Sequence, residues 1–273
     1  MRLGHSYVEA GDERALQTAL PADAGELATH MSYEREATAS REQFLASAGE
    51  RWVAELRAVL QELLDPARAV LSIGSGRGEH EVPLHLAGYD IVASEVVDGA
   101  LDDARRLFPG FRAVEFDVLA PRLDETYDDV LATGIDYVLD DDGLRTLFAT
   151  GRAITRPGGR VILVHRYRDS LATRAIDLLG LPAWALARNA FHRMRRDGVR
   201  IVRRQHGWRR TRGEIRALAE SCGFRTGRVR HAAFGMELAR LPVPGPVLRL
   251  VATADRRLHV LSSATVFEFL RTA

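Results

Sequence analysis

The residues best suited to chemistry lie in a short segment, 69–79. An apolar run over residues 69–73 ends in glycines on alternate positions, Gly74, Gly76 and Gly78. Glycine lets a backbone turn sharply out of a strand and lie against a ligand, because no Cβ stands in the way. The residues that follow can begin a helix whose first N–H groups point at that ligand. Glu95 ends the next apolar run, where a carboxylate can bind ribose hydroxyls. The spacing predicts a nucleoside-binding unit.

The spacing also excludes two common nucleotide sites. A dinucleotide fingerprint, G-x-G-x-x-G, needs glycine at position 79, and the chain has Glu79. A carboxylate at that helix end would repel a pyrophosphate. A P-loop needs Gly-Lys-Ser/Thr, and the chain contains no lysine.

The elements that position this loop alternate along the chain. Short β-branched runs at 69–73, 90–95, 111–116, 128–133 and 159–165 are separated by helix-compatible stretches. This alternation predicts βαβ units and a parallel sheet. Asp140 to Asp142 are expected to begin a helix that runs to about Ile154, with its acids at the favourable end of the dipole. Residues 227–233 and 263–270 should add an antiparallel pair. We therefore expect an α/β fold with a doubly wound, mostly parallel, seven-stranded Rossmann-like sheet.

The glycine pattern with Glu95 resembles motif I of the class I S-adenosylmethionine-dependent methyltransferases. The resemblance continues in four further segments and spans roughly residues 69–235. The segment 111–118 resembles the family's third strand, and 127–134 its fourth. Residues 156–164 are similar to its Pro-Gly-Gly turn into strand five, and 207–224 to its late helix and Gly-Phe step.

The resemblance implies S-adenosylmethionine as cofactor, with S-adenosylhomocysteine as product. In the family, the acid at the position of Asp117 hydrogen-bonds the adenine amine. An acid usually stands at position 72 and helps to hold the methionine ammonium, but this chain has Ser72. The cofactor-binding residues implied are Gly74, Ser75, Gly76, Gly78, Glu95, Val96, Asp117, Val118, Thr133 and Gly134.

Methyl transfer needs alignment of a nucleophile with an activated methyl group, and a general base helps when the acceptor carries a proton. Candidates by position are His165 at the end of strand five, then Asp136 and Tyr137 after strand four. For His165 a structural role is an equal alternative, and Tyr137 better suits the pocket wall. The Asn/Asp-Pro-Pro-aromatic signature of base and amide methyltransferases is missing after strand four. No metal site is expected, because the nine histidines lack ligand spacing.

The flanking segments predict appendages to one catalytic domain. Residues 1–65 are expected to form an N-terminal helical cap, with helical periodicity between Asp23 and Leu64. Residues 66–273 would form the methyltransferase domain, with 166–206 as a helical insertion after strand five on the substrate side. The apolar, Arg-ended part of that insertion could also rest on a membrane interface, so a peripheral membrane contact stays open.

Composition indicates an ordinary globular chain of 273 residues with one cysteine, Cys222. No segment suits a transmembrane helix or a signal peptide, so a cytoplasmic location is expected. Charge is divided unevenly: residues 1–150 hold 13 Arg against 29 acids, and the remainder holds 25 Arg against 8 acids. This asymmetry suggests an anionic partner for the basic half.

The leading interpretation is methyl transfer to oxygen, nitrogen or carbon of a small-molecule acceptor, apolar or anionic, in a biosynthetic pathway. One alternative is an RNA methyltransferase that uses the Arg-rich half. Sparse aromatic residues among those arginines count against nucleic acid. Another alternative is a non-catalytic cofactor-binding protein, which Ser72 alone supports. Both monomer and homodimer stay open.

Overall fold

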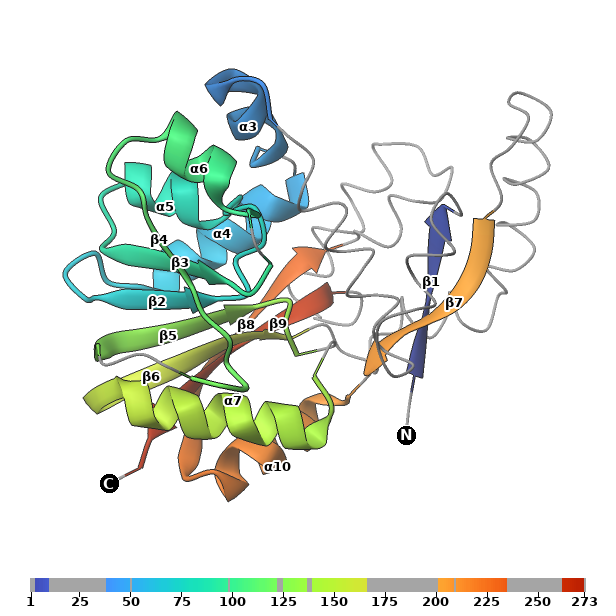
Figure 1. The fold of residues 1–273 in the computed structure, drawn as a ribbon. Helices are drawn as coiled ribbons and strands as arrows, with labels where there is room; N and C mark the ends of the chain where they lie inside the picture. The colour runs from blue at the N-terminus through green and yellow to red at the C-terminus, as the bar shows by residue number, and fades with distance from the viewer. Residues whose placement is uncertain are drawn as a thin grey trace.

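The computed structural model describes residues 3–9, 38–49, 51–97, 99–121, 125–136, 139–165, 201–208, 210–234 and 262–272 (Figure 1). Two helices precede the sheet, α3 (Arg41–Ser47) and α4 (Arg51–Leu63). The parallel part follows as β2 (Val70–Ile73), α5 (Glu81–Leu86), β3 (Ile91–Glu95), α6 (Asp102–Leu107), β4 (Arg112–Glu115), β5 (Tyr127–Thr133), α7 (Asp141–Ile154) and β6 (Thr155–His165). The last elements of the fold are α10 (Arg212–Ser221), β8 (Phe224–Phe234) and β9 (Ser262–Arg271).

The main sheet has seven strands in the order β4-β3-β2-β5-β6-β9-β8. The first five are parallel, β9 runs antiparallel to β6, and β8 runs antiparallel to β9. The predicted doubly wound, mostly parallel seven-stranded sheet is therefore confirmed. Five predicted strands lie within a residue or two of their places, except that β6 begins four residues earlier, at Thr155.

Helices cover both faces of this sheet, and the strand residues alternate between them. Leu71 and Ile73 face the cluster that contains Leu147 of α7 and Ile215 of α10. Val70, which precedes Leu71, points to the opposite face and belongs to the cluster with Leu60 of α4. Because successive side chains of a strand point to opposite faces, each buried strand needs apolar residues at every position. Figure 1 shows α4, α5 and α6 on one side of the sheet and α7 and α10 on the other.

Polar side chains begin the two long helices of the second face. Asp140 caps α7 by accepting a hydrogen bond from the Gly143 amide at 2.8 Å. The acidic run at 140–142 is therefore a helix start, as predicted. Thr211 and Glu214 form a reciprocal capping box at α10, which satisfies two N–H groups that the first turn leaves free.

A two-stranded antiparallel sheet pairs β1 (Leu3–Glu9) with β7 (Ile201–Trp208). The sequence did not predict β1, and β7 begins within the insertion at 166–206 that was expected to be helical. The expected cap at 1–65 is described only in part, and it is helical over 41–47 and 51–63. Residues 10–37 and 166–200 lie outside the described residues, so the proposed boundaries of the cap and the insertion stay predictions. Among the described helices, none has the length and apolar character needed to cross a membrane.

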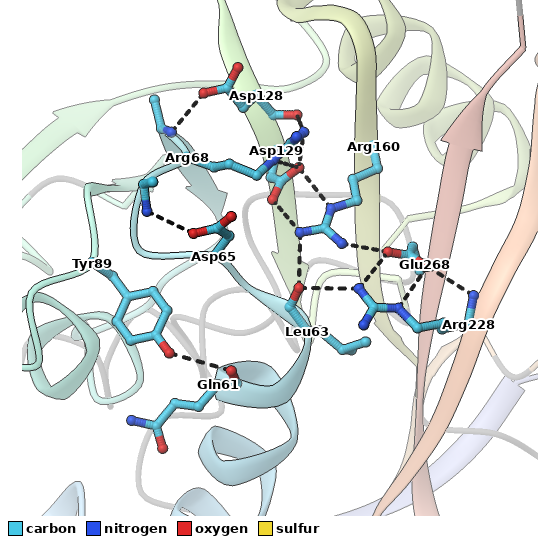
Figure 2. Close-up of polar contacts among 12 residues, drawn as sticks. Gln61, Leu63, Asp65, Arg68, Tyr89, Asp128, Asp129, Arg160, Arg228 and Glu268 are labelled. Atoms are coloured by element: carbon cyan, nitrogen blue, oxygen red, sulfur yellow. Dashed lines mark hydrogen bonds and ion pairs between the residues drawn. The ribbon is translucent and has the colours of Figure 1, made fainter.

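A buried ion cluster joins the strands toward the amino end of β5. The Arg160 guanidinium donates to both carboxylate oxygens of Asp129, at 2.9 and 2.8 Å, and to Glu268 at 2.5 Å. It also donates to the Leu63 carbonyl at the end of α4, at 2.9 Å. Figure 2 shows Arg160 between the two carboxylates, with Arg68 and Arg228 outside them. The cluster connects β5, β6 and β9 to α4.

Hydrogen bonds and charge attraction from Arg228 and Arg160 lower the pKa of Glu268 to about 2, against the opposing effect of burial. The same carboxylates raise the pKa of Arg160. Each acid in this cluster therefore has a cationic partner on a neighbouring strand.

We expect Glu268→Gln to lower the free energy of unfolding at pH 7 by about 3 kcal/mol, since it leaves a buried arginine short of a partner. The folded-state pKa lies below the ordinary 4.5, so this contribution is present above about pH 4.5. It should be lost as pH falls toward 2. Urea unfolding of both proteins at pH 7, 4 and 2.5 measures it. Glu62→Gln, at an exposed ion pair with Arg230, should change stability by under about 1 kcal/mol; equal losses in the two variants would contradict the assignment.

Candidate functional site

The carboxyl ends of four parallel strands meet along one edge of the sheet. Ile73 of β2 is in register with Ser94 of β3 on one side and with Ala132 of β5 on the other. Glu95 is in turn in register with Glu115 of β4. This registry places the residues after each strand in one row: the glycine loop 74–78, Glu95, Asp117 and Thr133.

The row lies at the topological switch point of the fold. From β2 the chain continues to β3 and β4 on one side, and then crosses to β5 on the other. Ligands of open α/β sheets bind outside the carboxyl ends of the strands at such a point. The glycine loop follows β2, so it lies directly at the switch between β2 and β5.

The loop can form only with glycine at its alternate positions. Gly74, Gly76 and Gly78 all have positive φ, at 70°, 53° and 83°, which other residues rarely adopt. A Cβ on Gly74 would also lie 3.3 Å from the Cβ of Ile135, which follows β5. The loop therefore packs against the segment after β5.

Glu95 holds this turn in place. One carboxylate oxygen accepts from the Gly76 amide at 2.8 Å, and the other accepts from the amides of Val96 and Val97 at 2.8 and 3.3 Å. Its side chain is half-buried, and Val96 beyond it is exposed. A carboxylate fixed by backbone donors at the end of β3 is the arrangement expected of a ribose-binding acid.

The remaining predicted cofactor residues divide into two groups. Asp117 is exposed, and its carboxylate accepts from the Leu119 amide at 2.8 Å, which orders the turn after β4. Gly134 and Thr133 are half-buried at the end of β5. Val118 differs from them: its side chain is buried in the core, and its carbonyl accepts from the Thr150 hydroxyl at 3.2 Å. Any role of Val118 toward a ligand would go through its backbone.

A carboxylate that the sequence analysis did not single out lies behind the loop. Glu81, in the first turn of α5, is fully buried, and the Ser72 hydroxyl donates to its Oε1 at 2.7 Å. Burial raises the pKa of Glu81 to about 7, opposed by hydrogen bonds from Ser72 and Ser75 and assisted by the charge of Glu95. The signal available in the sequence was an acid three residues after Gly78, opposite a serine at the position where the family has an acid.

Buried polar atoms without hydrogen-bond partners gather at the same edge. Among the described residues they include Glu79 Oε1, Glu81 Oε2 and Thr133 Oγ1, with Asp136 Oδ1 close by in sequence. Such atoms are rare in folded proteins because each one costs free energy. These four residues follow β2 or lie at the end of β5, whereas a further such atom, Thr226 Oγ1, belongs to β8.

The two described catalytic candidates contact each other in a fully buried cluster. Nδ1 of His165, at the end of β6, lies 2.5 Å from Asp136 Oδ2. Its Nε2 lies 3.1 Å from the carbonyl oxygen of Arg210, to which it can only donate. The Arg210 guanidinium donates to the carbonyls of Asp136 and Leu139 and to the Asp141 carboxylate. This cluster connects the ends of β5 and β6 to the start of α10.

The third catalytic candidate, Tyr137, lies outside the described residues. In the described ranges, no group of three or more His, Cys, Asp or Glu side chains is placed to hold a metal ion.

Comparison with known proteins agrees with this arrangement. No sequence profile of a protein family matches the chain. The TehB-like SAM-dependent methyltransferase from Corynebacterium glutamicum superposes with a TM-score of 0.53 at 18% identity, over 90% of this chain and 100% of that one. The chain has the fold of the class I methyltransferases that use S-adenosylmethionine. A second solved structure with this methyltransferase fold is the magnesium protoporphyrin IX methyltransferase from Synechocystis with bound SAM. It has a TM-score of 0.53 and 12% identity, over 93% of this chain and 99% of that one.

One curated relative is similar in sequence over a shorter stretch. A segment of 98 residues is 36% identical to Hemagglutinin 1 of Eikenella corrodens, covering 34% of this chain and 33% of that protein. The chain therefore spans about a third of the length of this relative.

The raised pKa of Glu81 predicts an unusual dependence of stability on pH. The folded-state pKa of about 7 lies above the ordinary 4.5, so the folded protein binds the proton more tightly than the unfolded chain. Stability of the ligand-free protein should therefore fall as pH rises from 4.5 to 7, by about 3 kcal/mol at 1.36 kcal/mol per pKa unit. Glu81→Gln should remove this loss and be more stable than the wild type at pH 8.

Urea unfolding without ligand at pH 5 and pH 8 measures this difference. Glu220→Gln makes the same change of charge on the exposed side of α10, and because it keeps Glu81 it should lose as much stability between pH 5 and pH 8 as the wild type. A Glu81→Gln variant that is less stable than the wild type at pH 8 would contradict the prediction.

Proposed function

We propose that this protein transfers the methyl group of S-adenosylmethionine to a small-molecule acceptor. The observation that carries the proposal is the row of acids around a glycine loop at the switch point. Glu79, Glu81, Glu95 and Asp117 give the segments at this edge four acids. A cofactor with a sulfonium, an ammonium and no phosphate suits such an edge, whereas a dinucleotide or a nucleoside triphosphate does not.

The residues at the edge fit the parts of this cofactor. Glu95 faces the ribose position at the end of β3, already oriented by the Gly76 and Val96 amides. We assign Asp117, which is exposed at the end of β4, to the adenine amine, as the family pattern implies. The glycine loop lets the backbone approach the methionine part closely, and the buried Thr133 hydroxyl has an unused hydrogen-bonding capacity beside it. These assignments apply the family pattern to residues that the fold brings together.

The bound cofactor supplies an activated methyl group, so the protein's part is to bind, orient and exclude water. We propose that Asp136 receives any proton that the acceptor loses, because its Oδ1 is the oxygen of the His165 cluster without a partner. His165 would then be a positioning residue, since both of its ring nitrogens have partners. Sequence position gave His165 as the first candidate for the general base and Asp136 as the second, so this assignment exchanges them.

Cofactor binding is the first test. Isothermal titration calorimetry with S-adenosylmethionine and S-adenosylhomocysteine should give saturable binding to the wild type. Glu95→Ala should weaken both by at least about tenfold, as expected when charge-assisted hydrogen bonds are lost. Asp90→Asn is the matched control, because Asp90 precedes the opposite end of β3 in an exposed pair with Arg112. Wild-type protein that binds neither compound would overturn the proposed function.

The acceptor class is tested with methyl-labelled cofactor and cell extract. We expect label in material below about 1 kDa that survives ribonuclease. Label that enters RNA instead would replace the small-molecule proposal with the RNA alternative. Binding without any transfer would support a non-catalytic cofactor-binding protein.

The roles of the buried pair can be separated with the same labelled transfer. Asp136→Asn should reduce kcat about 100-fold, the usual effect of a general base, with the cofactor Kd unchanged. His165→Gln should lower Tm and reduce kcat by less than tenfold, because it loosens Asp136 without removing the carboxylate. A His165→Gln variant that loses as much kcat as Asp136→Asn would return the role of base to His165.

A further inference from the structure

The carboxylate of Glu81, on helix α5, lies beside the strand position where the resembling family has an acid. The family acid stands at position 72, at the end of β2, and this chain has a serine there. Glu81 Oε1 lies 2.7 Å from the Ser72 hydroxyl. A carboxylate therefore reaches the surroundings of position 72 from α5 rather than from β2.

Glu81 differs from the other buried acids in its partners. Asp129 has Arg68 and Arg160, Glu268 has Arg160 and Arg228, and Asp136 has His165. Glu81 is as deeply buried as these acids, yet no ion pair joins it to a cation of the described residues. A buried carboxylate without a counter-charge costs several kcal/mol.

The second oxygen of Glu81 and its neighbours favour the binding of a cation. Oε2 is buried and lacks a hydrogen-bond partner among the described residues. Ser72 connects Glu81 to the glycine loop. Its hydroxyl donates to Glu81, and its carbonyl accepts from the hydroxyls of Ser75 and Ser94, at 3.2 and 2.7 Å. Glu95 adds a second negative charge nearby. The whole arrangement would be stabilised by a cation bound against the loop.

We propose that Glu81 supplies the negative charge that holds the cofactor's ammonium, in exchange for the acid missing at position 72. The inference rests on the proposed function, because it concerns the same cofactor. Glu81 is a positioning residue: it lies behind Ser72 and acts through the Ser72 hydroxyl and through its own charge. The pair Ser72/Glu81 thus moves an acid from the strand to the facing helix.

The test compares two ligands that differ in the amino-acid part. S-adenosylhomocysteine carries the ammonium, and 5′-methylthioadenosine has the same thioether nucleoside without it. Titration calorimetry at pH 8 should show that Glu81→Gln weakens S-adenosylhomocysteine at least about tenfold. The same variant should leave 5′-methylthioadenosine within twofold. Glu220→Gln, with an equal change of net charge, should leave both ligands unchanged.

A double exchange tests whether position or charge matters. Ser72→Asp combined with Glu81→Ala returns the acid to the strand and should bind S-adenosylhomocysteine within about threefold of the wild type. Glu81→Ala alone should bind it at least tenfold more weakly. Circular dichroism melting of each variant confirms that the weakened proteins are folded at the temperature of titration.

The outcomes distinguish this inference from the proposed function. Wild-type binding that Glu81→Gln leaves unchanged overturns the role of Glu81 and keeps the proposed function. Equal weakening of both ligands, or no recovery in the double variant, also overturns it, because the effect is then on loop shape. Failure of the wild type to bind either ligand overturns both proposals together.

Discussion

The turn that leaves β2 is held by charge-assisted hydrogen bonds to one side chain, Glu95, in addition to its backbone hydrogen bonds. Three glycines allow backbone angles that other residues rarely adopt, but glycine by itself does not select one conformation. The carboxylate of Glu95 selects it by accepting from the Gly76 amide while also binding the amides that follow β3. In the proposed function the same carboxylate binds the ribose, so the shape of the loop and the recognition of the nucleoside would both depend on Glu95.

Buried acids at the two ends of the sheet differ in whether they have a cationic partner. Toward the amino end of β5, Asp129 and Glu268 are neutralised by arginines, and the cluster joins β5, β6 and β9 to α4. At the carboxyl edge, Glu81 accepts a hydrogen bond from the Ser72 hydroxyl and has no ion pair with a cation of the described residues, and burial raises its pKa to about 7. An ion cluster with internal partners stabilises the fold by itself. A buried acid without a cationic partner costs stability, and this cost distinguishes the cation site proposed at Glu81 from the ion cluster at the other end of the sheet.

In the cluster of His165, Asp136 and Arg210, the buried acid is only partly satisfied: one oxygen of Asp136 contacts His165, and the other has no hydrogen-bond partner in the described part of the chain. The Arg210 guanidinium donates hydrogen bonds to two backbone carbonyls after β5, and the carbonyl of Arg210 accepts a hydrogen bond from His165 Nε2. Three segments distant in sequence thus hold one another at the edge of the proposed acceptor site. Rigid support of this kind suits methyl transfer, where alignment of the acceptor contributes more than acid–base chemistry.

The sequence by itself determined the sheet and the loop. Apolar runs with β-branched residues, separated by helix-compatible stretches, were sufficient to place β2 to β6, α7 and the late hairpin. These signals are local and repeat with the period of each element. Glycines on alternate positions and an acid at the end of β3 likewise indicated the nucleoside unit, because both the turn and the carboxylate lie next to the strands that position them.

Only the tertiary structure decided which polar groups meet. Glu81 reads in sequence as an ordinary acid in the first turn of a helix, and its burial against Ser72 depends on how α5 packs on the sheet. His165 and Asp136 are 29 residues apart, and Arg210 is 45 residues further on from His165. Strand β1 and its pairing with β7 also carried no local signal. Contacts of this kind depend on the packing of distant segments, which hydrophobic periodicity does not encode.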